Sequence, residues 1–289
     1  MSSEEITQLN ANMLEECKAG NLNAVRDLLD KGANLLNLGL RYACLGGHMD
    51  IVQLLIYKGA DDWDGGFCEA CTGDHLDIAK LMVSKGANRW NAGLTRACFK
   101  GHVNIVQYIL STATTAMSLN VGLIFACSGG RMGIARMLIS KGANDWDKAL
   151  YSACFNGHME IAQLMIFHGA KDWNPALCAA CDGKHFELAM LFVSLGATNI
   201  HMGLAAALMT EDYISAKALL TRGADVNIIR NVRLRDDHIC WLYKMGVKDV
   251  GRFDMDNRIK IKMQEERVLI ESILNIVLLP GLVDIIVNY

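Results

Sequence analysis

Residues 43–60 of the chain read ACLGGHMDIVQLLIYKGA, and close variants of this stretch return along most of the sequence. The glycine near the end of each copy sets the period, with successive spacings of 27, 27, 56, 27, 27 and 27 residues. The longest spacing equals two copies with two additional residues. The glycines that mark this period are Gly32, Gly59, Gly86, Gly142, Gly169, Gly196 and Gly223. Such a fixed period indicates a repeat protein.

Each copy predicts two helices joined by a turn. Ile51, Leu54 and Leu55 follow one another at the i, i+3, i+4 spacing of an amphipathic helix. Gly59 is placed to end that helix, because glycine adopts the left-handed backbone of a helix end at little cost. Upstream, residues 40–44 supply a shorter apolar stripe, and the two glycines at 46–47 separate it from the second helix. One such pair cannot bury its apolar face alone, so the copies are expected to stack into a continuous core.

The repeated run resembles the ankyrin repeat, in which two alanines and a Gly-His pair precede an aliphatic helix that ends in Gly-Ala-Asp-Val-Asn. Residues 223–227 match that ending outright, and the resemblance covers about residues 13–227 in eight copies. It implies an all-α, ankyrin-like solenoid of about eight helix-turn-helix repeats. It also implies a non-catalytic scaffold that binds a partner protein on its concave face, with no cofactor.

The copies depart from the usual ankyrin pattern in two ways. The Thr-Pro pair that usually opens the first helix is absent, and the period is shorter than the usual ~33 residues. The shortening falls where the β-hairpin loop should be, and we expect tryptophans in that loop to pack each on the next. These are Trp63, Trp90, Trp146 and Trp173. Short units with Asp-Trp-Asn or Asp-Trp-Asp in the loop resemble the large ankyrin families of giant DNA viruses.

Composition narrows the class of partner and the compartment. The 28 Lys and Arg residues nearly balance the 31 Asp and Glu residues, and no basic block occurs, which disfavours nucleic acid as a partner. The acidic residues 1–5 lack the basic-then-apolar order of a secretory signal. The apolar residues 273–287 are too few, and too interrupted by polar residues and proline, to span a membrane. We therefore expect a cytoplasmic monomer without a membrane partner, and the viral resemblance would place it in a host cell.

Recurring cysteines and histidines are predicted to be structural. Seven cysteines share one position of the repeat, and packed helices ~8–10 Å apart lie beyond the ~7 Å limit for a disulfide. These cysteines, which we expect to be buried thiols in a reducing compartment, are Cys17, Cys44, Cys71, Cys98, Cys127, Cys154 and Cys181. Histidines open the second helix once per repeat, too far apart to share a metal, and should hydrogen-bond the adjoining loop. They are His48, His75, His102, His158 and His185.

No residue set predicts catalysis or metal binding. Two Cys-x-x-Cys pairs, at residues 68–71 and 178–181, lie four repeats apart and cannot form one four-cysteine site. Neither a phosphate loop nor a Ser–His–Asp set stands out from the repeat pattern. We expect a protein that is not an enzyme.

The positions after the Ala-Cys pair differ from copy to copy, as a surface for a particular partner should. In ankyrin-like stacks this end of the first helix faces the concave side, where partners usually bind. The candidate partner-binding residues are Leu45, Thr72, Phe99, Lys100, Ser128, Phe155, Asn156 and Asp182. Phe99 and Phe155 are apolar where exposure is expected, which suits an interface. The alternative is that these two rings pack under the shortened loops.

The chain is predicted to divide into a solenoid, residues 1–227, and a helical C-terminal region, residues 228–289, that caps the last repeat. Within that region, residues 237–247 indicate an apolar helix stopped by Gly246. In the fourth repeat Ala113 replaces the closing glycine and two residues are added. We expect there either a helix that runs on or a looser joint.

The end of the chain carries an alternative function. Leu279, Pro280, Leu282, Ile285 and Ile286 resemble the opening of an F-box, a segment in which viral ankyrin proteins often end. The resemblance implies a substrate adaptor of a cullin-type ubiquitin ligase, with these residues binding the ligase. The other interpretation of the same residues is a hydrophobic cap on the solenoid.

Overall fold

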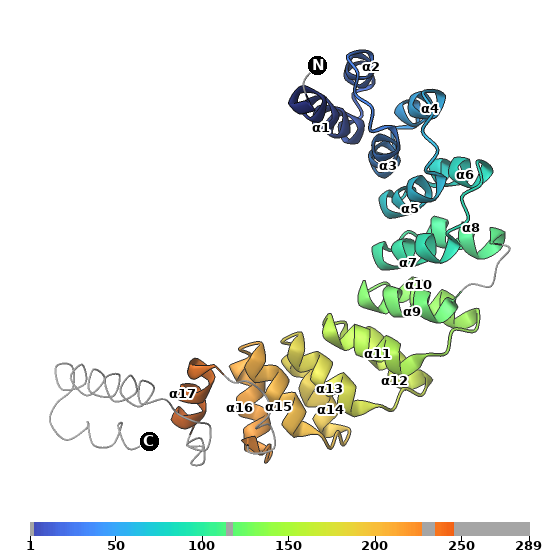
Figure 1. Ribbon diagram of the computed structural model, residues 1–289. Coiled ribbons are helices and arrows are strands. Elements are labelled where there is room, and N and C mark those ends of the chain that lie inside the picture. Colours follow the sequence, from blue (N-terminus) through green and yellow to red (C-terminus); the bar gives the residue numbers. More distant parts are fainter. Residues whose placement is uncertain (1–2, 114–117, 227–234, 246–289) are drawn as a thin grey trace, which may run out of the picture. The chain divides into compact units, whose positions relative to one another are not determined.

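The computed structural model describes residues 3–113, 118–226 and 235–245, and the regular elements in these ranges are α-helices (Figure 1). The chain divides into two compact units, unit 1 (Met1–Asp172) and unit 2 (Trp173–Tyr289). The described residues of each unit form the helix-turn-helix repeats that the sequence predicts, and α17 follows the last of them in unit 2. The expectation of an all-α repeat architecture is confirmed.

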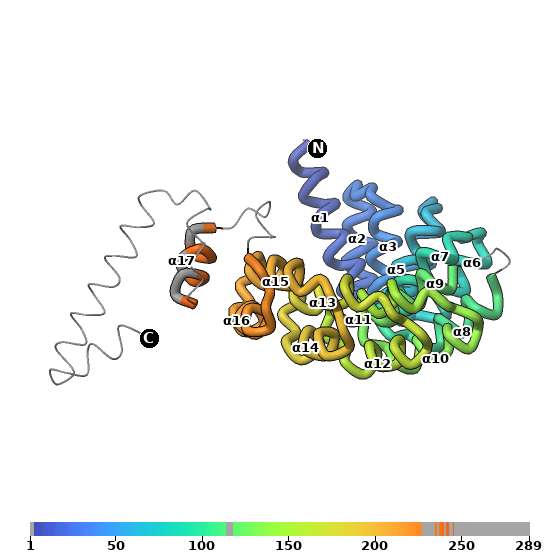
Figure 2. Tube along the Cα trace, turned by 90° about the horizontal axis from the view of Figure 1, so that it is seen from below, coloured from blue at the N-terminus to red at the C-terminus, as the bar shows by residue number. Residues whose placement is uncertain are grey.

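Unit 1 arranges its helices in two rows. Successive helix pairs follow one another along the unit, and the odd-numbered helices contact each other from repeat to repeat (Figures 1 and 2). We call this odd-numbered row the inner row: α1 (Ser3–Ala19), α3 (Leu36–Gly46), α5 (Trp63–Gly73), α7 (Trp90–Lys100), α9 (Leu119–Ser128) and α11 (Trp146–Phe155). The outer row is α2 (Leu22–Asp30), α4 (Met49–Tyr57), α6 (Leu76–Ser84), α8 (Val103–Thr112), α10 (Met132–Ser140) and α12 (Met159–His168).

The core lies between the two rows. In α3, Leu40, Ala43 and Cys44 are fully buried. In α4, Ile51 and Leu55 are fully buried as well. The same positions are buried in the following repeats, because the 27-residue period carries the apolar stripes from copy to copy. Fully burying each large aliphatic side chain contributes about 1.5–3 kcal/mol, so the stack of repeats, rather than any single helix pair, supplies the stability.

Glycines end most outer helices in the left-handed conformation, as predicted. Gly59 has a φ of 106°, and a Cβ placed there would meet no atom within 4 Å, so the backbone angle alone requires glycine. Ala113 in the fourth repeat instead follows the end of α8 at Thr112 with φ −61° and ψ 124°. The expected running-on of this helix was therefore wrong: alanine avoids the left-handed region, and the chain leaves the helix extended. The other expectation, a looser joint, falls on residues 114–117, outside the described ranges.

The tryptophans open inner helices and do not stack on one another as expected. Trp90 meets the ring of Phe67 edge-on, with centroids 5.5 Å apart, and Trp146 stacks on His168 at 5.2 Å. Their neighbours come from other positions of the repeat, because consecutive inner helices are held apart by the side chains packed between them.

Unit 2 continues the helix pairs with α13 (Trp173–Asp182), α14 (Phe186–Ser194), α15 (Ile200–Met209) and α16 (Tyr213–Thr221), followed by α17 (Asp236–Lys244). The apolar helix predicted at residues 237–247 is present as far as Lys244, and it buries Ile239 and Leu242. Its predicted stop at Gly246 lies outside the described ranges. Trp241 lies against Tyr213 of α16, with ring centroids 5.0 Å apart. The predicted boundary between residues 227 and 228 stays a prediction, as does the capping role of residues 228–289, of which 228–234 and 246–289 lie outside the described ranges.

Candidate partner-binding surface

In most repeats an asparagine or aspartate of the first helix, at the second position in α3, α5, α9, α11 and α13, ties that helix to the next repeat. Oδ1 of Asn37 accepts the main-chain N–H groups of Asp61, at 2.7 Å, and Asp62, at 3.1 Å. Two N–H groups are accepted in the same way by Asn10, Asp64, Asn120, Asp147 and Asn174. These bonds anchor the shortened loops, which keep their geometry without a β-hairpin. Sequence analysis missed this role, although the residues recur with the same period as the glycines.

The recurring histidines form a second set of bonds between repeats. Nε2 of His102 donates to the main-chain carbonyl oxygen of Thr72 at 2.9 Å. Equivalent bonds join His48 to Lys18, His75 to Leu45 and His158 to Ser128, at 3.0–3.1 Å. These four histidines are structural, as expected, but their acceptors lie near the end of the preceding inner helix rather than in the adjoining loop.

Side chains on one face of the inner row reach solvent. Positions 38, 41, 42 and 45 of α3 share that face at the i, i+3, i+4, i+7 spacing, and positions 39, 40, 43 and 44 are buried opposite. We call this face of α3–α11 in unit 1 the exposed stripe. Lys100 and Asn156, the exposed residues directly after the equivalents of position 45, are counted with it. Its side chains include Leu38, Arg41, Tyr42, Leu45, Glu69, Thr72, Arg96, Phe99, Lys100, Val121, Phe125, Ser128, Lys148, Tyr151, Phe155 and Asn156.

The exposed stripe presents several large aromatic rings. Phe99 is 40 % exposed and Phe155 is 46 % exposed, so neither ring is covered by a loop of the described residues. Phe125 and Tyr151 are exposed to a similar degree, at 41 % and 42 %. Sequence analysis did not find these two, because it considered only the positions directly after the Ala-Cys pair.

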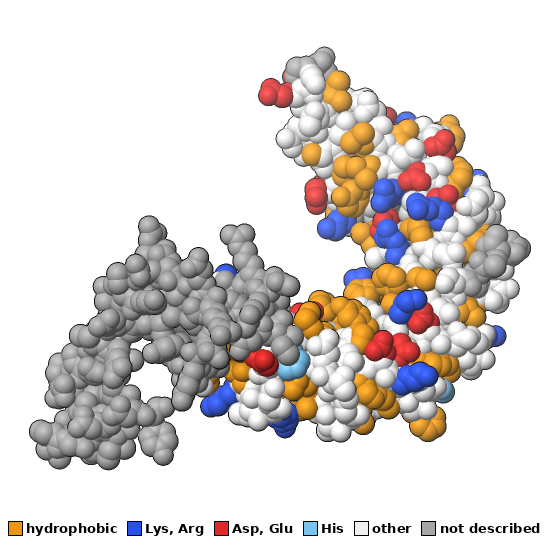
Figure 3. All heavy atoms as spheres, turned by 60° about the horizontal axis from the view of Figure 1, so that its bottom comes forward, with side chains coloured by type: hydrophobic (Ala, Val, Ile, Leu, Met, Phe, Trp, Pro, Cys, Tyr) orange, Lys and Arg blue, Asp and Glu red, His pale blue; other side chains and the backbone are white. Residues whose placement is uncertain are grey.

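Charged side chains of three successive repeats meet on the same stripe. Oε1 of Glu69 on α5 accepts hydrogen bonds from Arg41 Nη2 and Arg96 Nη1, each at 3.2 Å. Arg96 Nη1 also donates to Thr72 Oγ1 at 3.1 Å. The ammonium group of Lys100 lies 6.0 Å from the centre of the Phe99 ring. Figure 3 shows basic side chains gathered among hydrophobic ones over the part of unit 1 nearer the N-terminus.

Unit 1 brings seven of the eight predicted residues onto this one face. Leu45, Thr72 and Ser128 are half-buried there, and Asn156 Nδ2 donates to Ser128 Oγ at 3.1 Å. Asp182 occupies the equivalent position on α13 of unit 2, where burial raises the pKa of its carboxyl group. The predicted ligase-binding residues 279–286 lie outside the described ranges.

The cysteines are placed for packing rather than for chemistry. All seven at the repeat position are buried free thiols, and burial raises the pKa of Cys98 and of Cys154 to about 12. A thiol that stays protonated is a poor nucleophile and a poor metal ligand. Within the described ranges no group of His, Cys, Asp and Glu side chains is arranged to hold a metal ion.

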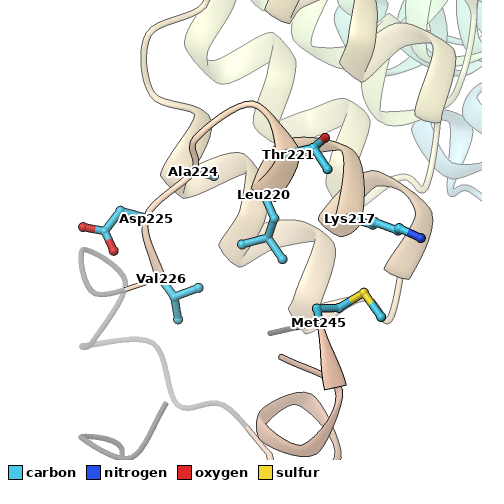
Figure 4. A pocket seen from close by; sticks show the side chains of 7 residues that line it. All are labelled: Lys217, Leu220, Thr221, Ala224, Asp225, Val226 and Met245. Carbon is cyan, nitrogen blue, oxygen red and sulfur yellow. The ribbon is translucent and has the colours of Figure 1, made fainter. Parts of the chain in front are cut away.

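A pocket in unit 2 lies beside α16. Leu220 and Val226 face Met245 across it, and its volume is about 360 Å³ (Figure 4). The chain leaves the described ranges directly after both Val226 and Met245. We therefore assign no ligand to this pocket. No helix of the described ranges is long and apolar enough to cross a bilayer.

A family model of ankyrin repeats in many copies matches residues 123–166, and a model of the single ankyrin repeat matches residues 40–64. The chain contains ankyrin repeats. The first match covers α9–α12 with the Arg131 and His158 positions, and the second runs from Leu40 in α3 to the start of α5. Both matched ranges therefore contribute residues to the exposed stripe.

Among solved structures, the crystal structure of the human ASB11 ankyrin repeat domain is similar, with 23% identity and a TM-score of 0.44. That match covers 55% of this chain and 84% of the other. A search of curated proteins returned no match.

Proposed function

We propose that this ankyrin-repeat protein is a non-catalytic scaffold that binds a partner protein through the exposed stripe of unit 1. The observation that carries the proposal is the group of four exposed aromatic rings on that stripe: Phe99, Phe125, Tyr151 and Phe155. Clustered exposed apolar side chains mark interaction sites on soluble proteins, and aromatic residues are enriched among those that contribute most to binding.

The rigid backbone under the stripe also supports the proposal. The carbonyl groups of Leu45, Thr72 and Ser128 are each held by a histidine of the next repeat. The Asn and Asp bonds hold the other end of the inner helices. A surface that is ordered before its partner arrives loses less entropy on binding, which favours affinity.

The recurring histidines and thiols contribute to the stack, which supports a scaffold. His48, His75, His102 and His158 donate to main-chain carbonyl groups, and the thiols of the repeat position are buried with raised pKa values. Buried thiols suit a reducing compartment, so we propose that the protein acts in the cytoplasm, as a monomer. The adaptor function stays a prediction from the sequence, because it depends on residues outside the described ranges.

A matched pair of substitutions in one repeat tests the proposal. Phe155→Ser removes an exposed ring from inner helix α11, and Phe167→Ser removes one that is 84 % exposed on outer helix α12. The full chain and both variants are used for affinity capture from cell extract, followed by quantitative mass spectrometry. Proteins that wild type enriches should be lost with Phe155→Ser and kept with Phe167→Ser.

Thermal melting followed by circular dichroism establishes that both variants fold. A partner that is lost only with Phe167→Ser would place binding on the outer row and refute the proposal. Equal enrichment by wild type and Phe155→Ser would also count against it.

A further inference from the structure

The end of the exposed stripe nearer the N-terminus is positively charged. Arg41, Arg96 and Lys100 contribute three positive charges, and Glu69 contributes one negative charge, which leaves a net of 3 − 1 = +2. Both guanidinium groups donate to the same oxygen of Glu69, although each carries five N–H donors. The side chains of Arg41 and Arg96 are 42% and 40% exposed, so a ligand can reach them.

The two arginines are held in place before any ligand binds. Arg41 lies over Gly65 of the next repeat, where a Cβ would come within 2.9 Å of Arg41 Cδ. Arg96 is fixed by its bonds to Glu69 and Thr72, and the side chain of Glu69 is only 14% exposed. A fixed pair of guanidinium groups is suited to a carboxylate, which accepts two parallel N–H···O bonds.

The other end of the stripe is apolar and aromatic. Phe125 on α9 and the Tyr151 and Phe155 rings on α11 are exposed. The basic residue of this end, Lys148, donates to Asp145 at 2.8 Å and so carries its own counter-charge. Phe99 stands between the two ends, beside Arg96 and Lys100 on α7.

We propose that the partner is a protein segment that carries an acidic side chain and, a few residues away, bulky hydrophobic side chains. The acidic group binds between Arg41 and Arg96, and the hydrophobic groups pack on Phe125 and Phe155. This inference rests on the proposed function and specifies the partner of the same surface.

The spacing of the helices sets the spacing within the segment. The acidic group between Arg41 and Arg96 lies beside α5. Packed helices lie ~8–10 Å apart, so α9 and α11 are roughly 16–20 Å and 24–30 Å from α5. An extended chain advances about 3.3 Å per residue, so the hydrophobic side chains should stand about five to six and about seven to nine residues from the acidic one.

A protein segment fits this surface better than a nucleic acid does. Strands of nucleic acid need positive charge along the whole groove that follows their phosphates. Here the net positive charge is confined to α3, α5 and α7, and Glu69 lies in its centre. The aromatic end would leave phosphates without partners.

Selection from a displayed library of random peptides of about twelve residues, on the immobilised full chain, tests the inference. The selected pool should be enriched in sequences with Asp or Glu about five to nine residues from Phe, Tyr, Trp or Leu. Arg96→Gln should weaken binding of that pool about tenfold or more, since it removes a charged hydrogen-bond donor. The matched control Arg136→Gln removes one exposed arginine from outer helix α10 and should leave binding unchanged.

The dependence of peptide binding on salt concentration provides a second measurement, and it begins with the wild-type protein. Binding of the pool by wild type should weaken as sodium chloride is raised, because partly exposed charges are screened. The double variant Arg41→Gln/Arg96→Gln should lose most of this salt dependence. A salt response that persists in the double variant overturns the inference.

The outcomes separate this inference from the proposed function. A pool without acidic residues, or one insensitive to Arg96→Gln, overturns the acidic partner, and so does a library that yields no enriched peptide. If Phe155→Ser still abolishes capture of cellular proteins, the proposed function survives that result. Enrichment of peptides whose binding requires Phe167 on the outer row overturns both.

Discussion

Nε of Arg131 donates a hydrogen bond to the main-chain carbonyl oxygen of Phe99 at 3.1 Å. In neighbouring repeats a histidine makes the equivalent bond, as His102 does to Thr72. A Cβ at Gly101 would lie 2.9 Å from Cδ of Arg131, so glycine leaves room for the arginine as it does elsewhere for the imidazole. The position therefore requires an N–H donor of suitable reach, and the guanidinium group meets that requirement at the junction of the fourth and fifth repeats.

Arg131→Ala should destabilise this junction. The carbonyl of Phe99 loses its donor, and a hydrogen bond of this kind contributes about 1 kcal/mol to stability. Urea denaturation measures the loss, and hydrogen exchange should locate it in α7 and α10, which this bond joins. Arg131→His is the control and should retain most of the stability. If the histidine variant were as unstable as the alanine variant, the donor role of this position would be refuted.

Asn37→Ala should weaken the link between the second and third repeats. Two main-chain N–H groups, of Asp61 and Asp62, lose their acceptor, at a cost of about 1–2 kcal/mol. Asn37→Asp should cost much less, because Asp64 and Asp147 accept the same pair of bonds elsewhere. The urea midpoints of the two variants decide the matter. Equal midpoints would show that the side-chain oxygen does not stabilise the loop.

Stability should fall at alkaline pH because of the buried thiols. Burial raises the pKa of Cys98 from its ordinary 9.0 to about 12, and Cys154 behaves alike. Between these two pH values the unfolded chain releases thiol protons that the folded chain keeps. A rise in pH therefore stabilises the unfolded state relative to the folded state. The contribution is intact below pH ~9 and is lost as the pH rises towards ~12.

Urea denaturation at about pH 8 and about pH 10 measures this effect. Cys98→Ala should cost roughly 1 kcal/mol or less, because the site accepts a small apolar group, and it should reduce the alkaline loss. Cys98→Asp should unfold the repeat, because a buried carboxylate without a partner is costly. Rapid alkylation of Cys98 in the folded protein would contradict its burial.

The packing of α17 should weaken at acidic pH. His238 is fully buried and accepts the main-chain N–H of Arg235 at Nδ1, and burial lowers the pKa of the imidazole below its ordinary 6.5. Arg235 disfavours the protonated form as well, whereas Glu211 and Asp237 favour it. The unfolded state binds the proton more readily, so stability is complete above pH ~6.5 and is lost as the pH falls through the lowered pKa.

Fluorine NMR of fluorotryptophan-labelled protein can follow this change. The Trp241 resonance, assigned by Trp241→Phe, should shift between about pH 7.5 and about pH 5 as the ring leaves Tyr213. His238→Gln cannot titrate and should abolish the shift. A shift that persists in that variant would assign the transition to another group.

The helices and their core were predictable because each depends on local period. Ile51 and Leu55, four residues apart on one face of α4, are buried as their spacing requires. Gly59 has the left-handed backbone that was expected. The run-on of the fourth repeat was wrong because an absent stop signal does not itself extend a helix. α8 ends at Thr112 although Ala113 cannot adopt the usual helix end.

The surface was predictable only in part. Phe99 and Phe155 stood out because they follow a recognisable Ala-Cys pair. Arg41, Glu69 and Arg96 did not, since they occupy two different positions of the repeat and meet only once the helices are stacked. The period of Asn37 and its equivalents was visible in the sequence, but its acceptor role depends on loops whose path no pattern specifies.

The bonds to the carbonyl groups of the exposed stripe separate two demands on the same residue. Thr72 is bonded to the next repeat through its main-chain carbonyl oxygen, which every amino acid has. Its side chain takes no part in that bond and faces solvent on the exposed stripe. Leucine, threonine, phenylalanine and serine occupy this position in successive repeats, and the hydrogen bond to the main-chain carbonyl oxygen is present in each. Selection, or an engineer, can therefore rewrite the specificity of this protein one repeat at a time while the stack beneath persists.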